Sequence, residues 1–215
     1  MPTSTTQRRP VEPSRPAGRM RKAERKKQLL AHAKQLFMAL GYHATTTEKI
    51  ASAAGVSEPV LYRHFESKKA LFVEVLHEIH QATLERWNAE ISRLSDPLAK
   101  LHALCNMYVG ATRSQPEDLR VIHRTLLEAE DPEIASCLRE SYLETEAVLT
   151  QIISEGQHAG VFRRSLDPRV GAWEMIRTGL GYALTLPLGI PLYQEADYLQ
   201  RAIDCMLHCL LKTDV

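Results

Sequence analysis

The segment spanning residues 45–65 constrains the fold of this chain more than any other part of the sequence. It reads as two short helices joined by a tight turn. Thr45 and Glu48 have the spacing of a capping box, which predicts the start of the first helix, and Gly55 supplies the left-handed residue that ends it. Ser57 can cap the second helix. Two short helices joined by a glycine-containing turn form the helix-turn-helix pattern, whose second helix enters the major groove of DNA.

The small residues of this segment also have a less specific interpretation, because Ala51 and Ala54 would allow close packing in many helical corners that do not bind DNA. The surrounding motifs make the pattern more specific. They are Ala-Thr-Thr, Ile-Ala, Ala-Gly-Val-Ser, Leu-Tyr-Arg-His-Phe, Ser-Lys and Ala-Leu-Phe. In order and spacing they resemble the TetR family of bacterial transcriptional regulators. The resemblance runs from about Leu29 to Leu76, and the rest of the chain resembles the family in layout only.

Hydrophobic spacing indicates helices from about residue 20 onward, and no segment alternates with period two, so the predicted fold class is all-α. Asp-Pro pairs at residues 96–97, 131–132 and 167–168 predict helix starts, because Asp caps a helix and proline is tolerated in its first turn. Outside the helix-turn-helix, the expected helices cover about residues 20–41, 68–94, 97–113, 115–129, 132–160, 168–186 and 195–212.

Composition and charge divide the chain into three parts. Residues 1–19 are rich in Pro, Arg, Thr and Ser and are expected to be a disordered basic extension. Residues 20–69 are predicted to form a three-helix DNA-binding domain, and residues 70–215 a larger helical domain. Up to Lys69 there are fourteen Lys and Arg against five Asp and Glu, whereas the remainder has thirteen against twenty-one. A basic DNA-binding domain (residues 20–69, called the head) on an acidic larger domain (residues 70–215, called the body) is typical of a head that binds phosphates. A solvated tail over the preceding residues explains part of the excess of Lys and Arg.

Within the helix-turn-helix, the resemblance implies that Glu58 and Val60 face base edges and that Tyr62 and His64 contact phosphates. Val60 can pack on a thymine methyl group, and Glu58 can accept a hydrogen bond from cytosine or, alternatively, stabilise the helix dipole. The alternative for Tyr62 is a half-buried brace. Lys68 can hold a phosphate at a helix N-terminus, or can be a solvated charge. The predicted DNA-binding residues are Thr46, Thr47, Ser57, Glu58, Val60, Tyr62, Arg63, His64 and Lys68.

The basic residues that precede the first helix have two interpretations. Arg15, Arg19, Arg21 and Lys22 can reach into a minor groove, as basic arms do, or can form a solubilising tail.

The resemblance also implies an enclosed small-molecule site between the helix that follows the DNA-binding domain and the next few helices. Aromatic, soft and polar-tipped side chains there suit an apolar or amphipathic ligand held by a few polar groups. Because cores use the same residue types, each residue has a core role as its alternative. The predicted residues are Trp87, Leu104, Met107, Tyr108, His123, Leu127, Tyr142 and Trp173.

A homodimer is implied as well, in which the helices over residues 168–186 and 195–212 pack with their mates as a four-helix bundle. Part of their apolar stripe must instead be intrachain core, and the sequence does not divide the two. The predicted interface residues are Trp173, Ile176, Leu180, Ile203, Leu207 and Leu210.

No metal, cofactor or catalytic centre is predicted. Three short spacings have metal-ligand character, but no helix supplies a complete tetrahedral set. They are His77–His80, His102–Cys105 and Cys205–His208–Cys209. The four cysteines lack disulfide-framework spacing and are expected to be reduced. No glycine-rich phosphate loop, nucleophile elbow or metalloprotease pair supports an enzyme.

The predicted function is a cytoplasmic, ligand-responsive transcriptional regulator, expected to act as a repressor. It would bind a palindromic operator in double-stranded DNA as a homodimer and be released by a mainly apolar small molecule. The alternative is a DNA-binding regulator of the same fold that is controlled by a protein partner or a metal ion. No signal peptide and no apolar run of membrane-spanning length is visible, so no membrane association is expected.

Overall fold

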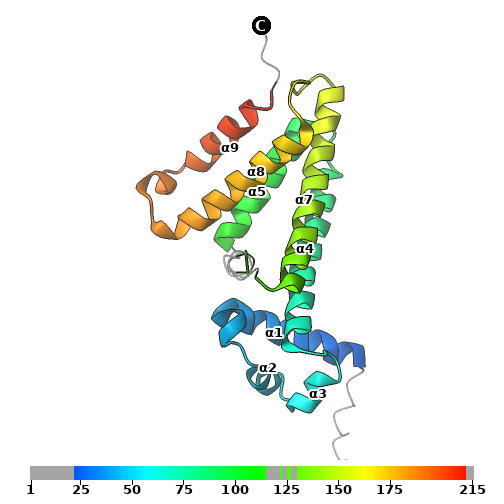
Figure 1. Ribbon diagram of the computed structural model, residues 1–215. Helices are drawn as coiled ribbons and strands as arrows, with labels where there is room; N and C mark the ends of the chain where they lie inside the picture. Colours follow the sequence, from blue (N-terminus) through cyan, green and yellow to red (C-terminus); the bar gives the residue numbers. More distant parts are fainter. Residues whose placement is uncertain (1–21, 115–121, 123–124, 127–129, 212–215) are drawn as a thin grey trace, which may run out of the picture.

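The computed structural model describes residues 22–114, 122, 125–126 and 130–211, which fold into helices with no strand among them (Figure 1). The all-α prediction is confirmed. The helices are α1 (Lys22–Ala44), α2 (Thr47–Ala53), α3 (Glu58–Tyr62), α4 (Lys68–Ile91), α5 (Pro97–Ser114), α7 (Pro132–His158), α8 (Pro168–Thr185) and α9 (Tyr198–His208), with short 3-10 turns η1 (Leu186–Leu188) and η2 (Pro191–Gln194). The predicted extension over residues 1–19 and most of the predicted helix over residues 115–129 lie outside the described residues.

The Asp-Pro pairs begin helices, as predicted. Asp131 accepts from the backbone amides of Glu133 and Ile134, at 3.0 and 3.4 Å, and so caps α7. Asp167 caps α8 in the same way. The carboxylate of Asp96 accepts from the backbone amide of Ala99 at 2.8 Å, at the start of α5. Each carboxylate pairs amide groups that the helix itself leaves unpaired.

The predicted capping box at the start of α2 is wrong by one residue. The N-cap is Thr46, whose hydroxyl accepts from the Lys49 amide at 3.2 Å. Thr45 is fully buried, and its hydroxyl donates to the backbone oxygens of Gly41 and Leu36 at the end of α1. Thr45 therefore closes the preceding helix and does not open the next one.

The cap of α3 also differs from the prediction. Ser57 occupies the N-cap position with extended backbone, but its side chain makes no capping hydrogen bond. Gly55 does adopt the predicted left-handed conformation, with φ of 66°, in the turn between α2 and α3. The last helix begins at Tyr198, three residues later than predicted, because the 3-10 turn η2 and an extended Glu195 occupy the preceding residues.

Two hydrophobic clusters hold the molecule together. The first joins the inward faces of α1, α2, α3 and the first half of α4, and it includes Ile134, Cys137 and Leu138 from the start of α7. The second lies between α5, α7, α8 and α9. In Figure 1 the short helices α2 and α3 lie at one end of the molecule, and α4 and α7 run side by side away from them. Because α4 begins in the first cluster and ends beside the second, it connects the two.

None of the described helices is both long enough and apolar enough to cross a lipid bilayer.

Candidate nucleic-acid interface and ligand cavity

The helices α2 and α3 are joined by a polar contact as well as by their shared core. The hydroxyl of Thr47 donates to the carboxylate of Glu58 at 2.5 Å, and it lies 3.3 Å from the hydroxyl of Tyr62. Beneath these side chains, Ile50 and Leu61 are fully buried. The contact to Thr47 gives Glu58 a structural role in fixing the angle between the two helices, in addition to its position in the first turn of α3.

Tyr62 is the large apolar side chain that this pair of helices leaves most open, with 49% of its surface exposed. Of the other predicted DNA-binding residues, Thr46, Ser57 and Arg63 are exposed, and Thr47, Glu58, Val60, His64 and Lys68 are half-buried. All nine lie in one stretch of 46–68 at the α2–α3 end of the molecule, so the structure brings them together.

Lys68 connects the end of α1 to the start of α4. Its ammonium group donates to the backbone oxygens of Tyr42 and Thr45, at 3.0 and 3.1 Å, and lies 4.3 Å from the centre of the Tyr42 ring. An ammonium group has three donors, so one remains for a phosphate. The interpretation of Lys68 as a plain solvated charge is therefore wrong, because its hydrogen bonds connect the start of α4 to the end of α1.

The surroundings of His64 are strongly basic. Burial lowers the pKa of His64 below its ordinary value of 6.5, and the charges of Lys22, Lys26, Arg25 and Arg63 lower it further. Its Nδ1 atom is buried without a hydrogen-bond partner among the described residues. Such a group of like charges is unfavourable in the free protein and is relieved by anions such as the phosphates of DNA.

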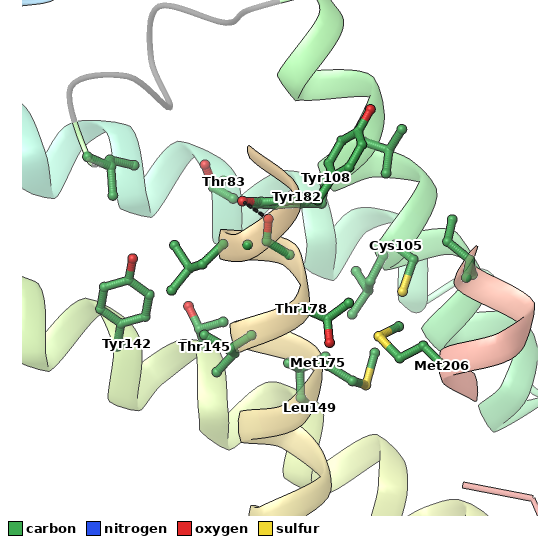
Figure 2. A pocket seen from close by; sticks show the side chains of 18 of the residues that line it. Thr83, Cys105, Tyr108, Tyr142, Thr145, Leu149, Met175, Thr178, Tyr182 and Met206 are labelled. Carbon is green, nitrogen blue, oxygen red and sulfur yellow. Dashed lines mark hydrogen bonds between the residues drawn. The ribbon is translucent and has the colours of Figure 1, made fainter. Parts of the chain in front are cut away.

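A cavity of about 410 Å³ lies between α4, α5, α7, α8 and α9 (Figure 2). Its walls are mainly apolar, with hydroxyl groups from tyrosine, threonine and serine placed among aliphatic and thioether side chains. Four of the predicted ligand residues line it: Trp87, Leu104, Tyr108 and Tyr142. The size and the composition of this cavity are those of small-molecule sites.

The other predicted ligand residues are not in the cavity wall. His123 and Leu127 lie outside the described residues. Met107 packs against the second hydrophobic cluster. Trp173 lies behind the wall, where its indole nitrogen donates to Glu146 at 3.0 Å and its ring stacks on Tyr142 at 6.3 Å between centroids. For Met107 and Trp173 the core alternative holds.

Glu146 explains why Trp173 faces away from the cavity. This carboxylate is only 5% exposed, and it accepts from Arg169 at 2.5 Å as well as from Trp173. The hydrogen bond from Arg169 holds the pKa of Glu146 below its ordinary value. A buried carboxylate needs such partners, and the indole of Trp173 is one of them.

The prediction identified Tyr108 and Tyr142 but missed most of the other polar residues of the wall, which come from α4, α5, α7, α8 and the end of the chain. The missed lining residues include His80, Thr83, Cys105, Ser141, Thr145, Thr178, Tyr182, Tyr193, Tyr198 and Met206. Among them, Tyr182, Tyr193 and Tyr198 form a cluster with ring centroids 5.5 and 5.0 Å apart. The concentration of tyrosines at residues 182–198 is a signal for this part of the wall, but the sequence analysis predicts a dimer interface for these helices.

The structure shows which apolar residues of α8 and α9 belong to the core of the chain, which line the cavity and which face outward. Ile176, Ile203, Leu207 and Leu210 are buried within a single chain, so their assignment to a dimer interface is corrected. Leu180 is half-buried and lines the cavity. The large apolar side chains that face outward on α8 and η1 are Val170, Leu184 and Leu188, which are 51%, 54% and 72% exposed.

The described residues contain no group of three His, Cys, Asp or Glu side chains that could hold a metal ion. His80 pairs with Glu144 at 2.9 Å, and Cys205 on α9 and Cys209 just after it are exposed.

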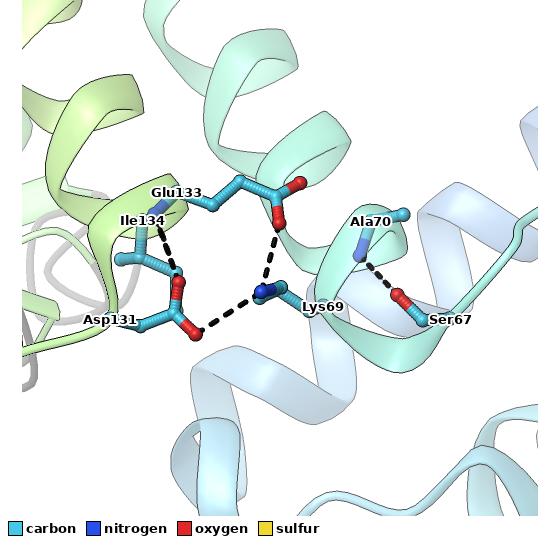
Figure 3. A network of polar contacts seen from close by, with 6 residues as sticks. All are labelled: Ser67, Lys69, Ala70, Asp131, Glu133 and Ile134. Atoms are coloured by element: carbon cyan, nitrogen blue, oxygen red, sulfur yellow. Dashed lines mark hydrogen bonds and ion pairs between the residues drawn. The ribbon is translucent and has the colours of Figure 1, made fainter.

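Ion pairs connect the head and the body at their junction (Figure 3). Lys69, in the first turn of α4, lies 2.9 Å from Glu133 and 3.3 Å from Asp131. Burial tends to raise the pKa of Asp131, but the backbone amides of Glu133 and Ile134, together with Lys69, lower it. The same carboxylate thus caps α7 and holds the start of α4.

Comparison with known proteins agrees with this geometry. Residues 29–75, which include α2, α3 and the start of α4, match the family model described as bacterial regulatory proteins, tetR family. The transcriptional activator FasR of Mycolicibacterium smegmatis is 46% identical over 70 residues, which are 33% of this chain and 32% of FasR, so the match spans about a third of either protein. The nucleoid occlusion factor SlmA of Vibrio vulnificus is 29% identical over 139 residues, 65% of this chain and 71% of SlmA.

The whole fold also has a counterpart among solved structures. A Saccharomonospora viridis protein described as a transcriptional regulator, and crystallised with choline, superposes with a TM-score of 0.79 at 22% identity, over 89% of this chain and 100% of that one. The helix-turn-helix sequence and the helical body are thus both matched. Residues 29–75 thus carry the helix-turn-helix sequence of the tetR family of bacterial regulatory proteins, and the fold of the chain is that of the matched structure.

Proposed function

We propose that this protein is a cytoplasmic repressor that binds a palindromic operator as a homodimer and leaves it when a mainly apolar small molecule occupies the cavity. Residues 20–69 would be the DNA-binding domain, and residues 70–215 the ligand-binding and dimerisation domain. The observation that carries the proposal is the apolar cavity of about 410 Å³, because α4 forms part of its wall and also begins inside the head.

The DNA-binding part rests on the α2–α3 unit. Its exposed Tyr62 and the basic surroundings of His64 suit contact with phosphates, and the half-buried Val60 suits contact with a thymine methyl group. The one remaining donor of Lys68 can reach a phosphate while the other two hold the end of α1.

Control by a ligand requires two arrangements of the molecule that bind the ligand with different affinity. We propose that the helix α4 transmits the effect of the ligand from the cavity to the head. Trp87, near its far end, lines the cavity, and Leu71 and Phe72, near its start, are buried in the core of the head. A ligand that displaces the far end would therefore tilt the head and change the spacing of the two recognition helices in the dimer, which must match about one turn of DNA.

The dimer surface we propose is the outward face of α8 with η1. Val170 in the first turn of α8, Leu184 in its last turn and Leu188 in η1 are exposed there, and exposed apolar side chains along a helix favour association. This surface replaces the buried residues of α9 as the predicted contact.

The experiment that tests the function is operator selection followed by ligand release. Purified protein is used to select duplexes from its own genome, and the affinity of the selected duplex is measured by fluorescence anisotropy over a range of salt concentrations. We expect a palindromic site and an affinity that falls steeply with salt. A small-molecule screen by thermal shift then identifies ligands, because a ligand raises the melting temperature by mass action. A ligand that binds the protein but leaves operator affinity unchanged would contradict the proposed control, and transcription in vitro decides between repression and activation.

A further inference from the structure

The hydroxyl group of Tyr182 stands out among the polar groups around the cavity. Its oxygen is buried and has no hydrogen-bond partner among the described residues. Two other tyrosines of the wall, Tyr108 and Tyr193, do have partners. Tyr108 donates to the backbone oxygen of Gly179 at 3.0 Å, and the hydroxyl of Tyr193 lies 2.9 Å from that of Thr185. A buried donor without a partner is unfavourable, and in a binding site such a group is usually completed by the ligand.

The charge of the cavity wall limits what can complete it. No Lys, Arg, Asp or Glu is among the described residues that line the cavity. His80 is the lining side chain that can carry a positive charge, and Glu144 at 2.9 Å already matches that charge. A carboxylate or an ammonium group placed in this cavity would therefore meet no unmatched opposite charge from the described wall, and it would lose its hydration.

The pKa values of the ionisable side chains in the cavity wall agree with a preference for uncharged groups. Burial raises the pKa of the Tyr142 hydroxyl and of the Cys105 thiol to about 12 each. The pKa of Tyr108 is also raised, first by burial and then by Tyr142. No cation in the part of the chain that the structure describes opposes these upward shifts, so this wall disfavours negative charge.

We infer that the cavity takes an uncharged molecule with an extended apolar part and one hydrogen-bond acceptor, such as an ester or ketone carbonyl or a hydroxyl oxygen, and that Tyr182 donates the hydrogen bond that anchors it. This inference rests on the ligand-controlled function proposed above and specifies its ligand class. A wall with an unpaired donor discriminates against analogues without an acceptor, because these leave the donor unpaired.

Two tyrosine-to-phenylalanine variants test the anchor. Tyr182→Phe removes a hydroxyl that has no partner in the free protein, so its melting temperature should equal or exceed that of the parent. Tyr108→Phe leaves the Gly179 oxygen without its partner, so its melting temperature should fall. Ligand binding should show the opposite order. Tyr182→Phe should weaken binding of an uncharged ester by about tenfold or more, whereas Tyr108→Phe should change it little. Tyr193→Phe is a second control, because its hydroxyl already has a partner.

The ligand class is tested with probes of one chain length: methyl decanoate, decanol, decanoate and decyltrimethylammonium. Binding is followed by thermal shift and by tryptophan fluorescence, because Trp87, one of the two tryptophans, lines the cavity. We expect the ester and the alcohol to bind about tenfold or more tightly than the two ions.

Each other outcome overturns a defined part. Tighter binding of decanoate or decyltrimethylammonium overturns the uncharged class, and unchanged ester affinity in Tyr182→Phe overturns the anchor. In both cases ligand control of DNA binding stands. If no probe binds while operator binding is intact, the inferred ligand class fails, and the small-molecule screen described above decides ligand control separately. If the ester binds as predicted but does not affect operator affinity, the inference stands and the proposed control fails.

Discussion

Lys69 in the first turn of α4 and Glu133 in the first turn of α7 form an ion pair of 2.9 Å across the junction between head and body. The same ammonium group lies 3.3 Å from Asp131, which caps α7. The helix α7 also contributes Tyr142 and Thr145 to the cavity wall. The pair therefore connects an element that contacts the ligand site with the start of the helix that carries the head.

We predict that Lys69→Met reduces the factor by which a ligand weakens operator binding, while ligand affinity in the absence of DNA stays close to the parent value. The reason is that the start of α4 would no longer follow the start of α7. Arg93→Met is the matched control, because it removes a surface ion pair with Glu90 at the end of α4, far from the junction. Operator titrations with and without ligand measure the factor. An equal reduction in both variants would show that the junction has no special part in coupling.

His64 makes operator affinity dependent on pH. In the free protein, burial and the neighbouring cations hold its pKa below 6.5. A phosphate beside His64 would raise that pKa in the complex, so the complex takes up a proton and its affinity should rise as the pH falls through the bound-state pKa toward the lowered free-state value. His64→Gln should remove this dependence. Anisotropy titrations across this range test it, and an affinity that does not change with pH in the parent would place His64 away from phosphate.

Tyr62 and Val60 should affect DNA binding in different ways. Tyr62→Phe removes an exposed hydroxyl that suits phosphate, so it should weaken binding by roughly tenfold across all sequences. Val60→Ala should change the preferred base at one position of each half-site as well as the affinity, because a thymine methyl group loses its contact. Selection from a randomised duplex library measures both. The same preference profile for Val60→Ala and the parent would remove Val60 from the base-reading residues.

The exposed leucine of α8 should control dimerisation. Leu184→Glu should shift the protein to monomer in light scattering and reduce operator affinity sharply, because a charge would be buried in an apolar interface. Leu143→Glu changes a leucine of similar exposure on α7 and should leave the dimer intact. Ile203→Glu should instead lower the melting temperature, since Ile203 lies in the core of its own chain. A dimeric Leu184→Glu variant would place the interface elsewhere.

Local signals in the sequence predicted the elements well and their terminal contacts less well. Asp131 and Asp167 are each followed by proline, and an Asp-Pro dipeptide before an apolar periodic segment favours a helix start over other local structures. Thr45 and Thr46 are adjacent residues of the same type, so spacing alone assigned the cap to the wrong one. The tertiary structure is what distinguishes them: Thr45 is buried and donates to backbone oxygens of α1, whereas Thr46 caps α2.

The DNA-binding residues could be predicted because they are close in sequence. The ligand cavity was much harder to predict because its wall comes from helices far apart in sequence. The nine predicted DNA-binding residues are close in sequence, and the structure places them together. The cavity draws on five helices, and no local pattern distinguishes Tyr142, which faces it, from Trp173, which is turned away by Glu146. Likewise, helical periodicity identifies the apolar faces of α8 and α9 but does not say whether the same chain or a partner covers Ile203.

The central claim is that ligand and operator compete through two arrangements of one molecule, and reciprocal binding tests it most directly. The affinity of methyl decanoate, or of the tightest ligand found by screening, is measured by calorimetry with the free dimer and with the dimer saturated by its selected operator. Linkage requires that the operator weaken ligand binding by the same factor by which the ligand weakens operator binding. We predict equal factors well above one, and equal ligand affinity with and without operator would contradict the account.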